Sequence, residues 1–438
     1  MQRMTGRAWI VCALALLLAV PGAMADVTPG DVVSKANWEQ VEGLVPDFIV
    51  DQVKAGRVEL KIGALDYDPG SFQLPGIAKS LETNSGRYGV DDAGNLIEAA
   101  TGKKYPTDLR AGGIPFPELA ANDAKLGWKL MYNYFYQANV ALGHQDMAAK
   151  QLTIGAGGIE QTCKLEGRTF IPAPDDGKYE WLMLAVYRAP YDISGIATLC
   201  KQPIVPDVGT VRYTYMPSTR KTRRMPSTTA SSEHYFGQES TEDDQCWGGP
   251  FFKVRNAEYK LKGVREMLVP FLDEKARSVE MLEGGGVDVN IGANQPLALG
   301  FETEGWAGAP WAMTNIVWVK RKVYEIEYTP RDDSDYLFGS GVGWVDAETF
   351  NPVYKYTTQA SDGKFSTETV FVSQGYQTID HTIRLMTVPM FLTVNPQRDR
   401  ATTYSRSARK GEFHKMLLSD KQVKKQEFSK SGFVRYCR

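Results

Sequence analysis

The sequence predicts a mainly β (α+β) protein whose core is an antiparallel sheet. From Lys150 onward, apolar and polar residues alternate with the period of two that puts one set of side chains on each face of a strand. Turn-forming sequences separate these segments, for example Asp346-Ala-Glu-Thr and Ser361-Asp362-Gly363. Consecutive strands joined by short turns favour an antiparallel meander over a βαβ alternation.

The first 25 residues have the three parts of a secretory signal peptide. Arg3 and Arg7 give a positive start, residues 8–20 form an apolar run, and Ala23-Met24-Ala25 is a small-x-small cleavage site. The apolar run is shorter than the ~18–20 residues that a membrane-spanning helix needs. We therefore expect an exported chain, cleaved after Ala25.

The mature chain, residues 26–438, is predicted to be one large domain with three parts. Residues 26–149 are expected to be helical and loop-rich, residues 150–384 to form the β-rich core, and residues 385–438 to be basic and partly helical.

The N-terminal part contains three predicted helices and one strand. Thr28 followed by Pro29 has the signature of a helix start, and a second helix is expected over residues 46–55, where Gly56 would end it. Residues 57–62 alternate as a strand, and residues 66–117 are expected to be mostly loop. The third helix is predicted over residues 123–137, because apolar side chains recur there at helical spacing.

The predicted strands of the core are short and closely spaced. They cover residues 151–154, 160–165, 181–188, 195–201, 210–216, 258–264, 316–328, 342–346, 353–359 and 365–373. Within 316–328 the apolar alternation is interrupted by Lys320 and Lys322, so we expect a bulge or bend between Trp318 and Tyr324 that curves the sheet.

Composition and motifs argue against several classes of function. Loss of Arg3 and Arg7 with the signal peptide moves the formal charge from −2 to −4, which disfavours a dedicated nucleic-acid binder. No zinc-type histidine spacing, nucleophile elbow or phosphate loop is present. We therefore expect no catalytic residue, cofactor or metal site. A hydrolase is the alternative, because two carboxylates that are far apart in the sequence can pair in the folded chain.

The mature chain keeps four cysteines: Cys163, Cys200, Cys246 and Cys437. An even number in an exported chain indicates disulfides, with three possible pairings. We favour Cys163 with Cys200, and buried thiols are the alternative.

Residues 213–226 (YTYMPSTRKTRRMP) combine aromatic and basic side chains. Residues 216–219 are predicted to be the turn of a hairpin, which places Tyr213 and Tyr215 on one face of the sheet. Arg223 and Arg224 are adjacent, so a strand sends them to opposite faces.

Two acidic residues follow this hairpin. Asp243 and Asp244 are candidate ion-pair partners of Arg223 and Arg224.

Three blocks of sequence together resemble a known family. They are Gly113-Ile-Pro-Phe-Pro117, the region 211–270 with KTRRMP and YKLKGVREMLVP, and the region 315–371 with NIVWVKRKVYEIEYTP and WVDAETFNPVYKY. Their order and spacing resemble the proteobacterial periplasmic domain-of-unknown-function family 1329, which is described as outer-membrane lipoprotein-sorting-like and is related to the LolA/LolB carriers.

The resemblance implies a fold, a compartment and a function. The fold would be a strongly curved antiparallel sheet, an unclosed LolA/LolB-like half-barrel, with helices covering its concave face. The protein would be a non-catalytic periplasmic carrier or accessory that binds a lipid or other hydrophobic molecule during transport to or across the outer membrane. Implied partners are a resistance-nodulation-type exporter and an outer-membrane barrel protein. An adaptor bridging those two proteins is the alternative.

The alternating strands supply candidate residues for such a site. The large apolar candidates for a hydrophobic cavity are Tyr213, Tyr215, Trp311, Trp318, Tyr324, Ile326, Tyr328 and Trp344. Arg212 or Arg224 is the candidate for contact with an anionic head group at the rim. A fully packed core would use the same apolar residues, and only space for a ligand distinguishes the two.

Overall fold

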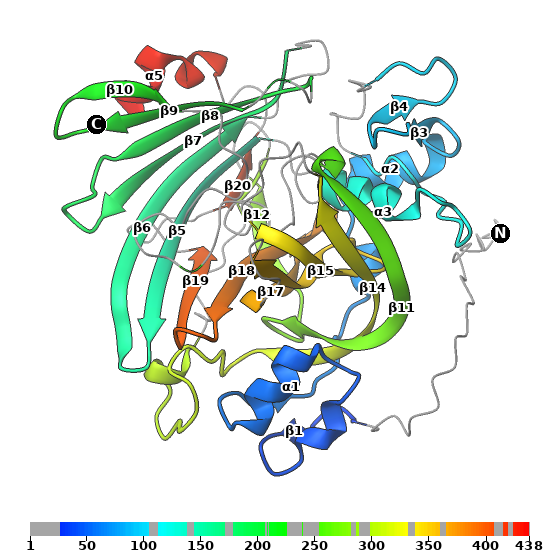
Figure 1. The fold of residues 1–438 in the computed structure, drawn as a ribbon, viewed down its shortest axis with the longest axis vertical. Coiled ribbons are helices and arrows are strands. Elements are labelled where there is room, and N and C mark those ends of the chain that lie inside the picture. The colour runs from blue at the N-terminus through cyan, green and yellow to red at the C-terminus, as the bar shows by residue number, and fades with distance from the viewer. Residues whose placement is uncertain are drawn as a thin grey trace.

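The computed structural model describes residues 27–104, 113–137, 144–170, 178–205, 208, 210–225, 239, 254–281, 286–288, 298–331, 338–359, 365–406, 415–418 and 424–437. These residues form a mainly β fold dominated by one large, strongly curved sheet that does not close into a barrel (Figure 1). The predicted signal peptide, Asp243, Asp244 and Cys246 lie outside the described residues.

One half of the sheet is an antiparallel meander in sequence order. Its strands are β5 (His144–Gly155), β6 (Gly158–Phe170), β7 (Tyr179–Ala189), β8 (Ala197–Pro203), β9 (Val211–Met216) and β10 (Lys221–Met225). Each pairs antiparallel with the next, so this half confirms the predicted meander.

The other half is built from the longer strands of the C-terminal region. They are β11 (Ala257–Phe271), β14 (Val317–Pro330), β15 (Phe338–Asp346), β16 (Pro352–Gln359), β17 (Phe365–Thr378), β18 (Arg384–Asn395) and β19 (Arg400–Arg406). The antiparallel pairing runs from β11 through β14 to β19, and β19 pairs with β5 to join the two halves. Short strands β12 (Arg277–Met281), β13 (Gly286–Asp288) and β20 (Lys415–Leu418) make a second connection, in which β12 runs parallel to β17.

Helices and short segments cover the sheet. The helices are α1 (Asp47–Lys54), α2 (Pro75–Thr83), α3 (Leu126–Phe135) and α5 (Lys430–Tyr436), and the small strand pairs are β1 (Val32–Val33) with β2 (Leu60–Lys61) and β3 (Tyr88–Val90) with β4 (Leu96–Glu98). The 3₁₀ turns are η1 (Trp38–Val41), η2 (Pro69–Ser71), η6 (Val254–Asn256), η7 (Gly300–Glu302) and η9 (Lys425–Phe428).

Three separate apolar clusters hold these helices on the sheet. The cluster of α1 includes Trp318 and Val370, that of α3 includes Ile326 and that of α5 includes Tyr215. In Figure 1, α1 lies at one end of the strongly curved β11–β14 pair, whereas α5 lies over the far edge of the β7–β10 region. The sheet is therefore covered at several places.

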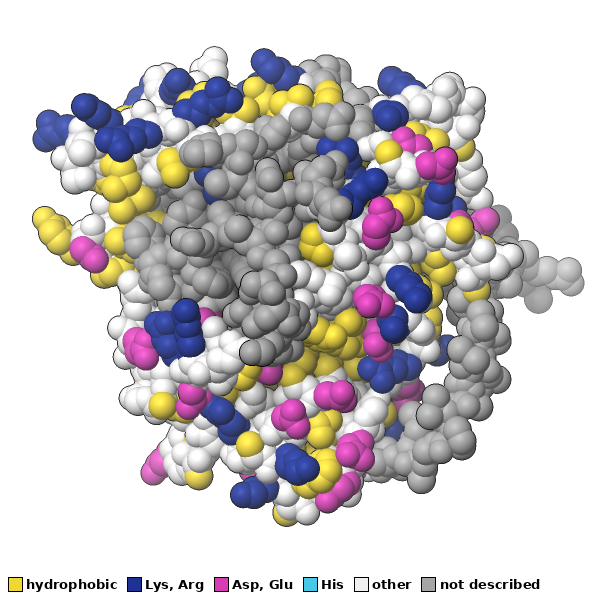
Figure 2. Space-filling view, in the orientation of Figure 1, with side chains coloured by type: hydrophobic (Ala, Val, Ile, Leu, Met, Phe, Trp, Pro, Cys, Tyr) yellow, Lys and Arg dark blue, Asp and Glu magenta, His cyan; other side chains and the backbone are white. Residues whose placement is uncertain are grey.

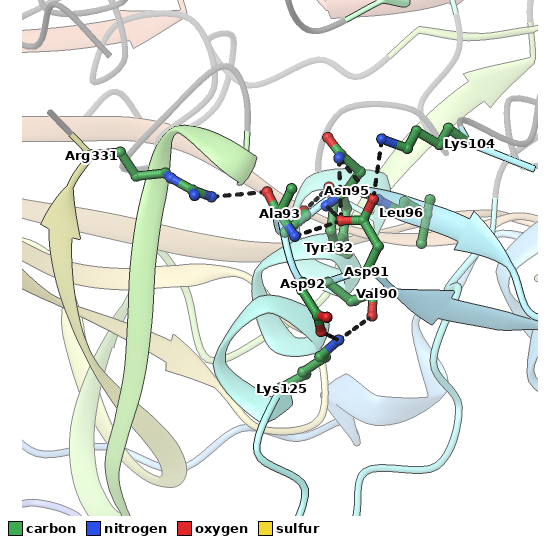
Figure 3. A network of polar contacts seen from close by, with 11 residues as sticks. Val90, Asp91, Asp92, Ala93, Asn95, Leu96, Lys104, Lys125, Tyr132 and Arg331 are labelled. Carbon is green, nitrogen blue, oxygen red and sulfur yellow. Dashed lines mark hydrogen bonds and ion pairs between the residues drawn. The ribbon is translucent and has the colours of Figure 1, made fainter. Parts of the chain in front are cut away.

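The β3–β4 turn anchors the region of α3 to the sheet (Figure 3). The carboxylate of Asp91 accepts hydrogen bonds from the backbone N–H groups of Ala93 (2.9 Å) and Asn95 (2.8 Å). Tyr132 of α3 donates to the carbonyl of Gly94 (2.8 Å), and Arg331, just after β14, donates to that of Ala93 (2.9 Å). Burial would raise the pKa of Asp91, but the bonds from Asn95 and the nearby Lys104 lower it overall. These contacts are structural.

The predicted N-terminal helix is wrong. Asp31 does accept a hydrogen bond from the backbone N–H of Thr28 (2.7 Å), but Gly30 has a φ of 100° and the chain leaves the turn as β1. The side chain of Asp31 thus caps a turn and not a helix. The pairing of β1 with β2, which is distant in sequence, determines the conformation of this segment. The two later helices are confirmed as α1 and α3, with Gly56 at a φ of 71° just after α1.

The predicted C-terminal segment is also different. Residues from 384 onward form β18, β19 and β20 before the short helix α5, so the sheet continues past the expected boundary at 384. Nearly every residue of β18 is buried, on both faces. A strand buried on both faces lacks the period-two alternation by which strands are predicted.

The predicted bulge lies in the neighbouring strand. Residues 317–325 of β14 pair with 263–271 of β11 without a shift, so none occurs between Trp318 and Tyr324. The shift comes between Leu261 and Gly263, where Lys262 is the extra residue of β11. A bulge in either strand of a pair bends both.

No disulfide joins Cys163 to Cys200. Cys200 lies across from Met183, and Met183 lies across from Thr169, which is six residues from Cys163 along β6. That offset is about 20 Å at the rise of a strand, whereas bridged cysteines need Cα atoms within about 7 Å. Cys437 is also a buried thiol and donates to the carbonyl of Phe433 (3.0 Å).

Candidate functional site

An apolar cavity lies where α1 covers the sheet. Phe48 and Ile49 of α1 form one wall, and Val370 of β17 with Leu392 of β18 forms the opposite wall. The register of the two strands explains this wall, because Val370 is directly opposite Leu392 and therefore shares its face. Trp318 of β14 also lines the cavity.

The loop before β14 supplies the remaining side of the cavity. Trp311, only 2% exposed, lines it beside Trp318. The backbone N–H of Ala309 donates to the carbonyl of Arg57 (2.8 Å), and the guanidinium of Arg57 lies 5.4 Å from the ring centroid of Trp311. The segment that follows α1 therefore holds Trp311 in place, so the N-terminal region and the sheet build this site together.

One hydrogen-bonded polar pair lies within these apolar walls. Gln52 of α1 donates to the carboxyl of Glu368 of β17 (3.3 Å), and both side chains are buried. Burial raises the pKa of Glu368 from its ordinary value of 4.5 to about 8, and the negative charge of Asp51 raises it too. The hydrogen bond from Gln52 and the positive charge of Arg57 lower this pKa, but by less. Glu368 is consequently mostly protonated at neutral pH.

Three further polar atoms around the cavity lack a hydrogen-bond partner among the described residues. They are Oε1 of Gln52 and the indole N–H groups of Trp311 and Trp318. A protonated Glu368 carries an O–H that can donate to Oε1 of Gln52, whereas a carboxylate cannot. The arrangement therefore favours an uncharged polar centre in an apolar pocket.

The cavity is small. Its volume of about 30 Å³ exceeds the ~10–15 Å³ that one water molecule needs, but it is far below the ~300–1,000 Å³ of typical ligand pockets. A long apolar ligand can therefore enter only if α1 or the loop before β14 moves away from the sheet.

A second, smaller cavity lies beside the first. It has a volume of about 10 Å³ and is lined by Ile326, Tyr328 and Trp344 of the sheet and by residues of α3. Trp344 packs edge-on against Phe48, with ring centroids 6.4 Å apart, and Phe48 lines the first cavity. The two cavities are thus separated by a cluster of aromatic rings.

The sequence-predicted residues fall into three places. Trp311 and Trp318 line the cavity under α1, and Ile326, Tyr328 and Trp344 line the second cavity; Tyr324 is half-buried on the same face of β14 and packs with the cluster of α3. Tyr213 and Tyr215 lie far along the sheet, under α5. The ligand-binding role of all eight stays a prediction.

The basic candidates are divided between the two faces of the sheet. Arg212 is buried and lies opposite Met225, whereas Arg224 is exposed and lies opposite Tyr213. Arg223 pairs with Thr214 and therefore shares the face of Arg212. The predicted hairpin is confirmed, and its two adjacent arginines point to opposite faces.

Sequence reasoning missed Gln52 and Glu368. A signal was present for Glu368, because it has the same parity as the neighbouring Val370 and Val372, which are both buried. A charged residue at a core position in a strand indicates a special environment.

The described ranges contain neither a metal centre nor a membrane-spanning helix. No group of three or more His, Cys, Asp and Glu side chains within them could hold a metal ion. Likewise, none of the helices in these ranges is long and apolar enough to cross a membrane.

A family model described as a protein of unknown function (DUF1329) matches residues 32–431. The chain belongs to this family. A comparison with curated proteins finds no match.

Solved structures of DUF1329 and LolA-superfamily proteins are similar to this chain at low identity. A Vibrio parahaemolyticus domain described as an outer membrane lipoprotein-sorting protein is 13% identical, with a TM-score of 0.47 over 72% of this chain and all of that one. A DUF1329 protein from Desulfovibrio piger is 14% identical, with a TM-score of 0.47 over 70% of this chain and 98% of that one. A LolA superfamily protein from Nitrosomonas europaea is 12% identical, with a TM-score of 0.39 over 68% of this chain and 96% of that one. None of them defines a ligand for this chain.

Proposed function

We propose that this DUF1329 protein is a non-catalytic carrier of a lipid or another hydrophobic molecule, which it binds where α1 covers the sheet. The observation that supports this most is the apolar cavity between α1 and strands β14, β17 and β18, with its uncharged polar pair of Gln52 and Glu368. The walls suit an acyl chain, and the polar pair offers hydrogen bonds to an uncharged head group.

The energetics of opening set a minimum size for the ligand. Four apolar side chains of α1 are buried: Phe48, Ile49, Val50 and Val53. Exposing them costs about 8 kcal/mol, at ~2 kcal/mol each, and burying a methylene returns ~0.8 kcal/mol. A ligand that displaces α1 must therefore bury about ten methylenes, which is the length of a fatty acyl chain.

We further propose where the protein acts and which proteins it meets. An exported chain with such a site would act in the periplasm, in transport to or across the outer membrane. An inner-membrane exporter of the resistance-nodulation type and an outer-membrane barrel protein would be its donor and acceptor. These partners are proposed from the family resemblance of the sequence blocks.

Ligand binding can be tested with two matched variants of β17. Val370→Phe fills the cavity from the wall that β17 and β18 form. Val372→Phe makes the same change on the same face of the strand, but outside the cavity lining. Both overpack a core at a cost of about 1–3 kcal/mol, so circular dichroism must first show that both fold. Titration with a fluorescently labelled fatty acid should then show binding by the wild type and Val372→Phe, and at least about tenfold weaker binding by Val370→Phe.

Native mass spectrometry and lipid extraction of the purified protein complete the test. We expect a co-purifying hydrophobic molecule, recovered chemically unchanged. If the wild type neither carries such a molecule nor binds the fatty acid, the carrier proposal fails. Conversion of the bound molecule would instead favour a hydrolase.

A further inference from the structure

A group of cations lies on the face of the sheet where α5 packs, far from the cavity under α1. Tyr213 of β9 lies directly opposite Arg224 of β10, so the two side chains share this face. Leu199 of β8, opposite Tyr213 on the other side, belongs to the cluster that holds α5. Arg224 therefore projects from the same face, at the outer strand of the described sheet.

Three lysines gather on the same face. The ammonium of Lys430, at the start of α5, lies 4.6 Å from the ring centroid of Tyr213. Lys178 and Lys201 lie 5.3 Å and 5.8 Å from the ring centroid of Tyr179. Burial and the positive charges of Lys178 and Lys430 lower the pKa of Lys201, so both of these lysines lie near enough to Lys201 to repel its charge.

No carboxylate within the described ranges forms an ion pair with Lys178, Lys201, Arg224 or Lys430. The nearest acid of the C-terminal segment, Glu427, is bonded instead to Arg168 (2.7 Å). Figure 2 shows dark blue side chains gathered over β9, β10 and α5 at the upper left, with no magenta among them. Like charges held together without counter-charges attract an anionic partner.

We propose that this outer basic patch, made of Lys178, Lys201, Arg224 and Lys430 with Tyr179 and Tyr213, docks the protein on the surface of an anionic phospholipid bilayer. A bilayer presents phosphates over an extended plane, and the patch is likewise spread over β7, β8, β9, β10 and α5, with Lys178 just before β7. The two tyrosines combine an apolar ring with a polar tip, as side chains at membrane interfaces do.

A single bound phosphate fits the patch less well. Phosphate sites usually use converging backbone N–H groups. Here the strands that carry the cations pair with one another through their backbones in antiparallel ladders, which occupy most of those groups.

The hairpin provides a matched pair of variants. Arg223 and Arg224 are neighbours in one strand, both are exposed, and they point to opposite faces. Arg224→Glu therefore changes the outer basic patch, whereas Arg223→Glu makes the same change in net charge on the other face. A basic side chain near an anionic bilayer strengthens binding by about fivefold, so reversal of its charge should weaken binding by about 25-fold.

The test is sedimentation of the full chain with vesicles of phosphatidylcholine, alone or mixed with phosphatidylglycerol. We expect binding to the mixed vesicles only, a loss of about 25-fold for Arg224→Glu, a loss below about fivefold for Arg223→Glu, and a strong decrease in about 1 M salt. Arg224→Gln, expected to lose about fivefold, serves if the charge-reversed variant does not fold.

Three results would overturn the proposal. They are equal binding to both kinds of vesicle, equal losses for the two arginine variants, and displacement from vesicles by inorganic phosphate at constant ionic strength, which would assign the patch to free phosphate. Fatty-acid titration without vesicles should be the same for Arg224→Glu and wild type, so this inference and the carrier proposal can fail separately.

Discussion

Replacement of Glu368 by Gln gives the sharpest prediction about stability. Glu368 is only 6% exposed, and burial raises its pKa from 4.5 to about 8. In the unfolded chain the carboxyl ionises near 4.5, so above this pH the unfolded state is stabilised relative to the native state. The stability of the wild type must therefore decrease as the pH rises from 4.5 to about 8, and level off above it.

The span between the two pKa values fixes the size of the effect. From 4.5 to about 8, at 1.36 kcal/mol per pH unit, the free energy of unfolding changes by up to about 5 kcal/mol. At pH 7 most of this loss, about 3 kcal/mol, is already present. Glutamine has nearly the same shape and no ionisation, so the Glu368→Gln variant should lack this part of the pH dependence.

Urea denaturation between pH 4.5 and 9 measures this pH dependence of the free energy of unfolding. The difference in stability between Glu368→Gln and wild type should grow in favour of the variant by several kcal/mol across this range. Glu42→Gln, the same change at an exposed position, is the control and should stay within about 0.5 kcal/mol of wild type. Parallel pH profiles for Glu368→Gln and wild type would refute the assignment of a buried, protonated carboxyl.

Two further predictions concern the sheet that supports the site. The guanidinium of Arg321 donates to both oxygens of the buried Asp346 (2.7 and 3.0 Å). Arg321→Ala should therefore lower the free energy of unfolding, measured by urea denaturation, by about 3–5 kcal/mol. A decrease below about 1 kcal/mol would contradict this. A Cβ at Gly341 would collide with the carbonyl of Tyr356, whereas one at Gly343 meets nothing within 4 Å. Gly341→Ala should therefore destabilise by about 1–3 kcal/mol, and Gly343→Ala should be neutral or stabilise by up to about 1 kcal/mol; equal melting temperatures of the two variants would contradict the packing described.

The sequence predicted elements whose determinants are local. Helix α1 begins after Pro46 and ends before Gly56, and both residues act on the backbone next to them. The β15–β16 turn is equally local, since Asp346 accepts hydrogen bonds from the backbone N–H groups of Glu348 (3.0 Å) and Thr349 (2.9 Å). Such features can be recognised without knowledge of the rest of the fold.

Elements decided by distant partners could not be predicted in this way. Thr28 and Asp31 make the contacts of a helix start, yet β1 forms because β2 is available to pair with it. The cavity under α1 brings Gln52 to Glu368 across 316 positions of sequence, so its polar centre follows from the tertiary structure alone. The family resemblance supplied the curved, unclosed sheet, which period-two alternation does not specify.

Amide hydrogen exchange of α1 tests the central claim, that a hydrophobic ligand binds between this helix and the sheet. The protein is compared with and without a saturating fluorescently labelled fatty acid, and α5 serves as the internal reference. We predict faster exchange in residues 47–54, because a ligand between α1 and the sheet displaces this helix, and no change in residues 430–436. Binding of the fatty acid with unchanged exchange in α1 would contradict the account.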